Sequence, residues 1–214
     1  AIWGRTVGAA AFDTLNGAYA FEYDPAWVDS GPELSPLTMP NRKGDPYVFP
    51  DLNRNTFHGL PGLLADALPD AFGNAVIDAW LAREGIAKSS ISGLDRLAYA
   101  GDRAMGALTF HPAAALSATP VTAIAIADIV VAARDVLARN VVAASSHTDA
   151  LQQLIQVGSS AGGARAKAIV QFRPDTEQIR SGHAPAEPGF SHWLMKLDGI
   201  SAAADGSTNS LDEP

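Results

Sequence analysis

The stretch Val157–Val170, VGSSAGGARAKAIV, decides how the second half of the chain is interpreted. It places two serines and three glycines in front of two cations and then continues into apolar residues that predict a short β-strand. Glycines let backbone N–H groups approach phosphate oxygens, because no Cβ atom stands in the way. The stretch therefore fits either a phosphate-binding loop or a flexible turn before a strand.

A second predicted strand, SHWLMKLDG over 191–199, presents Lys196. A lysine on a strand beside a glycine-rich loop can neutralise two phosphates, which is the nucleotide-binding arrangement of a protein kinase N-lobe. The stretch is not a Walker motif, because GxxxxGK[ST] is missing and a strand, not a helix, follows the loop. On spacing alone, a flexible turn and a solvated edge lysine are the simpler interpretation.

Composition limits the classes of protein that the chain can belong to. Its 214 residues, 47% of them hydrophobic, suffice for one large or two small globular domains. The 15 Lys and Arg against 23 Asp and Glu give a net charge of -8, which argues against a protein that grips nucleic acid through its own charge. The absence of cysteine excludes disulfides and thiolate-bound zinc.

Nothing in the apolar segments predicts export or a membrane span. The first ten residues, AIWGRTVGAA, lack the charged start, apolar run and cleavage site of a signal peptide. The longest apolar tract, 121–140, is interrupted by Asp128, Arg134 and Asp135 and is too polar for a span of about 20 residues. We expect a cytoplasmic protein that does not contact a membrane.

The first part of the chain predicts a small mixed unit. Asn16-Gly17 between apolar runs predicts a β-hairpin over 1–23, because both residues tolerate positive φ. The six prolines of 24–51 predict extended or turned chain with little helix. A helix over 68–85 is expected with Asp70 as its N-cap and Gly85 as its stop, followed by a shorter helix over 92–100 and a closing strand over 105–110.

Residues 113–146 change composition and predict a connecting segment that contains one helix. Thr119 and Pro120 supply its start, and the face with Val130 and Ala133 is expected to be buried. The strands 166–172 and 191–199 are then expected to pair across a long loop. The predicted fold class is α+β, with a subdomain over 1–112, the connection over 113–146 and a last unit over 147–214.

Four segments together resemble the HipA-like serine/threonine kinases, the toxin halves of bacterial toxin–antitoxin pairs. They are GLLADALPDAFGNAVIDAWL, RLAYAGDRAMGALTFHP, VGSSAGGARAKAIV and HWLMKLD, in the family's order and approximate spacing. The resemblance covers nearly the whole chain up to Lys196. It implies a family-specific N-terminal subdomain followed by the N-lobe of a kinase-like fold.

The resemblance also implies an ATP site and a switch. Its loop would wrap the ATP phosphates, and Lys196 would hold the α- and β-phosphates. The residues of that loop are Gly162, Gly163, Ala164, Arg165, Ala166 and Lys167. In the family a serine before the loop is autophosphorylated and the enzyme is silenced; Ser160 matches it best and Ser159 is the alternative. A phosphate of about -2 charge would repel the ATP phosphates, so ejection of the loop makes physical sense.

The catalytic half of a kinase is not found in this sequence. In the family the base and the Mg²⁺ ligands lie in a C-lobe downstream of the strand lysine, and nothing after Lys196 resembles HRDxxxxN or DFG. We expect this chain alone to be inactive in phosphate transfer. The family implies ATP and Mg²⁺ as cofactors and a protein substrate, with glutamyl-tRNA synthetase the known example. It also implies a HipB-like helix-turn-helix antitoxin, through which operator DNA is reached indirectly.

An alternative function stays open beside the kinase. Some relatives divide the kinase between two polypeptides, and the chain would then be a binding or regulatory module that inhibits or completes a separate C-lobe. Other candidate residues favour structural roles. The five histidines are too scattered for a metal site, Asp66 and Asp70 suit helix capping better than catalysis, and the four tryptophans are expected to pack in cores.

Overall fold

The computed structural model describes residues 1–104, 106–114, 126–137, 154, 165–185 and 187–201. The chain divides into two compact units, one of Ala1–Pro69 with Ser89–Ala118 and one of Asp70–Lys88 with Thr119–Pro214. These units do not follow the predicted segments, because 70–88 groups with the later part of the chain. The domain boundaries 1–112, 113–146 and 147–214 therefore stay a prediction.

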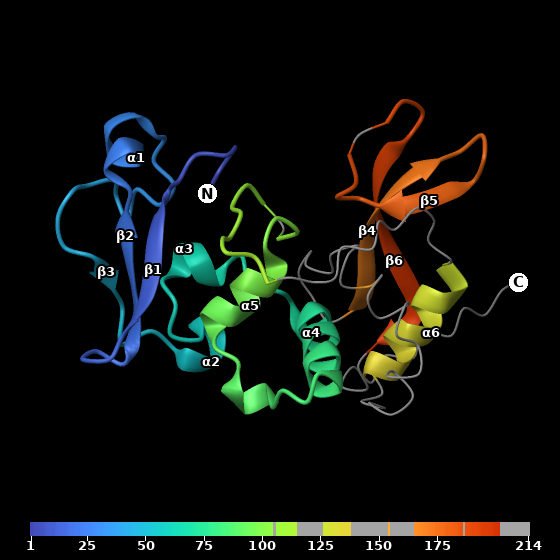
Figure 1. Cartoon of the computed structure of the whole chain (residues 1–214), viewed down its shortest axis with the longest axis horizontal. Helices are drawn as coiled ribbons and strands as arrows, with labels where there is room; N and C mark the ends of the chain where they lie inside the picture. Colours follow the sequence, from blue (N-terminus) through green and yellow to red (C-terminus); the bar gives the residue numbers. More distant parts are fainter. Residues whose placement is uncertain (105, 115–125, 138–153, 155–164, 186, 202–214) are drawn as a thin grey trace, which may run out of the picture. The chain divides into compact units, whose positions relative to one another are not determined.

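The first unit contains the predicted hairpin (Figure 1). Strands β1 (Gly8–Asp13) and β2 (Ala18–Tyr23) pair antiparallel, and the short β3 (Tyr47–Val48) pairs with β2, which gives the order β1-β2-β3. Gly17 takes a φ of +61° in the turn, as the Asn-Gly signal predicts. The Asn16 side chain donates to the Asp13 carboxylate, which lowers the pKa of Asp13 and secures the turn.

A short helix replaces part of the predicted extended chain. Helix α1 (Pro25–Ser30) begins at Pro25, and the Asp24 carboxylate accepts from the backbone N–H of Ala26. Proline is favoured in the first turn of a helix, where its missing N–H costs nothing. The expectation of mostly extended or turned chain over 24–51 holds outside this one short helix, which was not predicted. The helix buries Trp27, whose side chain is one of the largest fully buried ones.

The remaining elements of the first unit close its core. They are α2 (Arg54–Phe57), α3 (Gly62–Ala65) and α5 (Gly93–Ala100), with a 3₁₀ turn, η1 (Lys88–Ser90), before α5. The α5 prediction is confirmed, since Ser92 and Asp95 form a reciprocal capping box. The core gathers residues from strands and helices, namely Ile2, Val7, Tyr19, Phe21, Tyr23, Trp27, Met39, Tyr47, Leu60, Leu64, Ala67 and Leu97.

The predicted closing strand over 105–110 is wrong for its described residues, 106–110, which form no strand. The N–H of Thr109 donates to the carbonyl of Ala1 at 2.8 Å, and that of Phe110 donates to the carbonyl of Gly101 at 2.9 Å. Gly106 takes a φ of +102°, which a regular strand does not accommodate. The segment is held by a reciprocal pair of backbone bonds between Ala1 and Thr109 and by the bond of Phe110, and not by a ladder.

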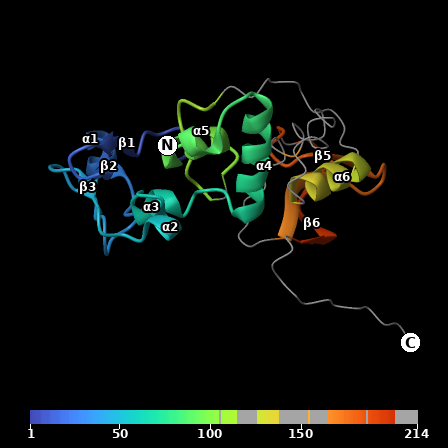
Figure 2. The ribbon, with the colours of Figure 1, turned by 90° about the horizontal axis from the view of Figure 1, so that it is seen from below.

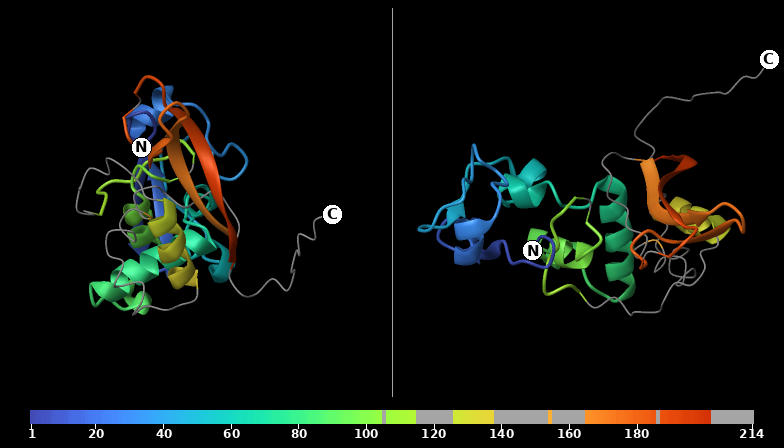
Figure 3. Two further views of the ribbon diagram at one scale, coloured as in Figure 1. Left: turned by 90° about the vertical axis from the view of Figure 1, so that its right-hand side faces the viewer. Right: turned by 90° about the horizontal axis from the view of Figure 1, so that it is seen from above.

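The second unit combines two helices with a second antiparallel sheet. Its described elements are α4 (Ala71–Arg83), α6 (Ile126–Leu137), β4 (Arg165–Arg173), β5 (Gln178–Ser181) and β6 (Ser191–Ser201), and the strand order is β5-β4-β6. Helix α4 contacts β4 and α6, and α6 contacts β6. Figure 2 shows α6 alongside β6, and Figure 3 shows the long strands of this sheet running together.

Helix α4 begins and ends where the sequence predicts. The Asp70 carboxylate accepts from the N–H of Gly73 at 2.8 Å, so Asp70 is its N-cap. Gly85 lies just past the end with a φ of +74°. The N–H of Ile86 donates to the carbonyl of Leu81, and the N–H of Gly85 donates to the carbonyl of Ala82. These bonds form a Schellman motif, for which glycine is the favoured residue. Phe72 and Val76, which are one helical turn apart, are both buried.

The sequence misses strand β5. The predicted loop 173–190 contains it, and the turn that leads into it places Glu177 at a φ of 54° where a glycine or asparagine is more usual. The prediction that the strands on either side of this loop pair is confirmed, since β4 and β6 are neighbours. The predicted helix over 119–140 is confirmed over Ile126–Leu137, with Ala133 buried; Thr119 and Pro120 lie outside the described residues.

Candidate functional site

The predicted nucleotide-binding residues fall into two groups. Ser159, Ser160, Gly162, Gly163 and Ala164 lie outside the described residues. Arg165, Ala166 and Lys167 begin strand β4, and Lys196 lies on β6. The described part of the site is therefore the strand that continues the glycine-rich stretch and its neighbour.

The two lysines lie directly opposite each other. Lys167 pairs with Lys196 in the antiparallel register of β4 and β6, so their side chains leave the same face of the sheet. The next rung on that face pairs Ile169 with Leu194. The expectation that Lys196 stands on a strand beside the one after the glycine-rich stretch is confirmed.

Lys167 is held in a buried ion pair. Its Nζ donates to Oδ2 of Asp70 at 2.6 Å, and the two side chains are only 5% and 6% exposed. Asp70 reaches this position because it caps α4, which contacts β4 within the second unit. The same carboxylate thus stabilises the start of a helix and neutralises a cation that lies 97 residues away along the chain.

Lys196 is in a different environment from Lys167. Its side chain is exposed, and no ion pair or hydrogen bond of that side chain occurs within the described ranges. Leu194, on the same face, is 47% exposed. An exposed cation next to an exposed apolar side chain is an arrangement that can take an anionic ligand with a flat apolar part.

A buried polar network fixes the other end of this face. Nε and Nη2 of Arg180 donate to Oε1 of Gln171 at 2.8 and 2.6 Å, and Arg180 also pairs with Glu187 at 2.5 Å. The guanidinium lies over the Phe190 ring, 4.0 Å from its centroid. Gln171 donates to the carbonyl of Ala184 at 2.7 Å. This network ties the segment before β6 to the sheet and so stabilises the strand that carries Lys196.

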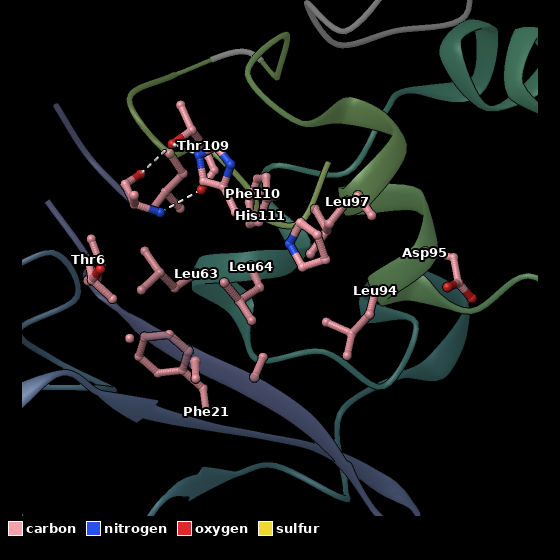
Figure 4. Close-up of a pocket in the computed structure, with 18 residues that line it drawn as sticks. Thr6, Phe21, Leu63, Leu64, Leu94, Asp95, Leu97, Thr109, Phe110 and His111 are labelled. Atoms are coloured by element: carbon pink, nitrogen blue, oxygen red, sulfur yellow. Dashed lines mark hydrogen bonds between the residues drawn. The ribbon is translucent and has the colours of Figure 1, made fainter. Parts of the chain in front are cut away.

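A cavity of about 440 Å³ opens within the first unit (Figure 4). Most of the side chains around it are apolar, and they come from the start of β1, from α3, from α5 and from 108–112. In Figure 4, Leu63, Leu64, Leu94 and Phe21 surround the opening, with Asp95 and His111 at its rim. The sequence did not predict this cavity, because residues far apart along the chain form it.

The structure describes several of the other candidate residues. Within the described ranges, no group of three or more His, Asp or Glu could hold a metal ion, and His147 lies outside them. No helix among the described residues is both long enough and apolar enough to cross a membrane. Trp27 packs in the core as predicted, but the prediction is wrong for Trp3 and Trp193, which are 80% and 56% exposed.

The fold thus defines a small α+β protein with an exposed lysine on one sheet. Residues 1–111 match the family model described as HipA N-terminal domain, which is more than half of the 214-residue chain. The chain therefore belongs to the HipA family, a kinase family that acts in toxin–antitoxin systems with a HipB-like partner. Comparisons with curated proteins and with solved structures gave no match.

Proposed function

We propose that the chain is the ATP-binding, N-terminal part of a serine/threonine kinase toxin. The observation that carries this proposal is the register that sets exposed Lys196 opposite the strand following the glycine-rich stretch. The family match supports it, because the family is one of kinases. In this proposal Lys196 neutralises the α- and β-phosphates of ATP, and backbone N–H groups of 162–167 hold the phosphate oxygens.

The chain supplies binding and orientation in this reaction. Transfer of the γ-phosphoryl group also requires Mg²⁺ and a base that orients the attacking hydroxyl. The base and the residues that coordinate Mg²⁺ are expected from a C-lobe. The sheet would keep Lys196 in place because β6 is bonded to β4 along most of its length. Holding the phosphates in a fixed position lowers the entropic cost of the transfer.

The partners and the switch are part of the same proposal. The protein would be cytoplasmic, would phosphorylate a translation protein such as glutamyl-tRNA synthetase, and would reach operator DNA only through a HipB-like antitoxin. Phosphorylation of Ser160, or of Ser159, would silence it, because the added charge competes with ATP phosphates for the same N–H donors. The net charge of -8 agrees with leaving the DNA contacts to the partner.

The complete gene product, incubated with ATP and Mg²⁺, tests the proposal. We expect phosphate on Ser160 or Ser159 by mass spectrometry, and we expect Lys196→Ala to reduce it by at least roughly tenfold, since a charge-assisted phosphate contact contributes about 1.5–3 kcal/mol. Lys88 is an exposed lysine that pairs with Asp78 of α4, and it offers the matched control. The Lys88→Ala protein should be phosphorylated to the same extent as the wild type. Undiminished labelling of the Lys196→Ala protein would contradict the assigned site.

A second candidate is a binding or regulatory module of a split kinase. The cavity of the first unit favours it, because a largely apolar opening of this size suits a ligand or the side chains of another protein. The gene separates the two candidates. A reading frame that continues into a C-lobe with catalytic Asp and Asn residues supports the kinase, and a natural stop after Pro214 supports the module.

A further inference from the structure

Asp70 uses both of its carboxylate oxygens within the second unit. Oδ1 accepts from the N–H of Gly73 at the start of α4, and Oδ2 accepts from Nζ of Lys167 on β4. A carboxylate at a helix N-terminus is stabilised by the helix dipole, and here it also has a buried counterion. The Asp70 side chain therefore joins the first turn of α4 to the start of the strand that follows the glycine-rich stretch.

This pairing changes what Lys167 can do. A phosphate that approached its Nζ would also approach the Asp70 carboxylate, and both side chains are nearly sealed from water. Two anions in a poorly hydrated place repel strongly, and a buried ion pair is costly to break. Lys167 is thus a poor phosphate ligand as long as Asp70 holds it.

Lys196 has no such competitor among the described residues. It lies directly across from Lys167, and two like charges at that spacing repel each other. Because Asp70 neutralises Lys167, the three side chains together carry one net positive charge, and it is on the exposed member. The ion pair therefore leaves Lys196 as the cation that a phosphate can reach.

We propose that Asp70 is a positioning residue that withdraws Lys167 from phosphate binding and assigns this role to Lys196. The inference rests on the proposed ATP site and deepens it, since it separates two lysines that the sequence pattern treats alike. Asp70 would act through Lys167 and through the start of α4, without touching the nucleotide. Lys167 would then be a structural cation despite its place next to the glycine-rich stretch.

Variants of the complete gene product test this division. Asp70→Asn keeps an oxygen that can cap α4 but removes the charge, and Lys167→Met keeps the length of the side chain but removes the ammonium. We expect each single change to raise the unfolding equilibrium constant by roughly 100-fold, because it strands one buried charge. The double variant should recover much of that loss, since neither charge then remains.

Binding of ATP·Mg²⁺, measured by calorimetry, gives the functional readout. The double variant should bind within roughly threefold of the wild type, and Lys196→Met should bind at least roughly tenfold more weakly. Adenosine, which has no phosphate, should bind both variants alike. A loss of tenfold or more in the double variant would show that Lys167 contacts phosphate and would overturn the proposal.

Lysine acetylation of the wild-type chain, followed by peptide mass spectrometry, does not depend on any variant folding. We expect Lys196 to be acetylated rapidly and to be protected by ATP, and Lys167 to react slowly with or without ATP. Rapid labelling of Lys167 would overturn the buried pair. If ATP does not bind the wild type, the proposed ATP site is refuted. The unfolding data then test the ion pair of Asp70 with Lys167 by themselves. If the effects of the two single changes on the free energy of unfolding simply add in the double variant, the structural role of Asp70 is refuted as well.

Discussion

Tyr23 shows how a single buried polar group links the first unit to pH. Its hydroxyl donates to the carbonyl of Met39 at 2.8 Å inside the core, and its residue surface is 4% exposed. Burial raises the pKa of Tyr23 to about 12, with smaller contributions from the nearby Glu33 and Tyr47. The neutral phenol is therefore the form that the fold requires.

The raised pKa predicts a loss of stability at high pH. Below pH 10, the ordinary pKa of tyrosine, Tyr23 is neutral in the folded and in the unfolded protein, and its stabilisation of the fold is fully present. As the pH rises from 10 through about 12, the tyrosine of the unfolded chain ionises while the buried one stays neutral, so the folded state loses stability relative to the unfolded state. We expect a loss of about 2–3 kcal/mol in the free energy of unfolding over this range. Urea unfolding between pH 8 and 12 measures it.

Tyr23→Phe provides the comparison for this pH dependence. The variant gives up one buried hydrogen bond, so it should be about 1 kcal/mol less stable at neutral pH. It should also fall less steeply than the wild type above pH 10, because the ionising group is gone. Equal slopes for the two proteins would show that Tyr23 is not the group that sets the alkaline limit.

Residue-scale prediction from the sequence succeeds where the signal is local. The cap at Asp70, the short helix after Ser92 and the turn at Gly17 each depend on residues close together in the sequence, and each prediction is confirmed. The pair of Asp70 with Lys167 was not predicted, because its partners are 97 residues apart and each has an ordinary local explanation. One carboxylate can cap a helix and also pair with a distant lysine, and a sequence pattern shows only the helix cap.

At the scale of elements, the end of α4 depends on one glycine. Gly85 takes a φ of +74°, and a Cβ atom added there would meet no other atom within 4 Å. Any cost of substitution therefore comes from the backbone conformation. We expect Gly85→Ala to lower the free energy of unfolding by about 1 kcal/mol, measured by urea or thermal unfolding.

Gly85→Asn is the matched control, because asparagine tolerates the left-handed region better than alanine does. Its loss should be clearly smaller than that of Gly85→Ala. The reverse order would mean that side-chain contacts, and not the positive φ of this residue, determine how α4 ends.

Elements whose ends are not marked by a typical capping or turn residue were harder to predict. Strand β5 was missed because its turn uses Glu177 in the left-handed region, and α1 was missed because prolines were taken to oppose helix although Pro25 starts one. The segment 106–110 was assigned to a strand from its apolar residues, yet Gly106 turns the chain away from a ladder. In each case one unusual backbone angle or position outweighed composition.

At the scale of the whole molecule, compact units and sequence segments differ. The family model matches 1–111 without interruption, whereas α4 belongs by its contacts to the second unit. Its buried residues Phe72, Val76 and Leu81 are at most 1% exposed, and α6 and β4 are among the elements that α4 contacts. The sequence pattern does not predict this grouping, because the contacts of α4 with α6 and β4 join residues that are far apart along the chain.

This grouping predicts that a fragment of residues 1–118 will be incomplete. It retains the strands and core of the first unit, so far-ultraviolet circular dichroism should still show ordered structure. It lacks β4 and α6, so the apolar face of α4 should lose its cover, and we expect stronger binding of an apolar dye and self-association at micromolar concentration than for the whole chain. Replacing Phe72 and Val76 by Gln in the fragment should reduce both signals. A fragment that stays monomeric, binds no dye and keeps α4 protected from hydrogen exchange would show that the helix belongs with the matched region after all.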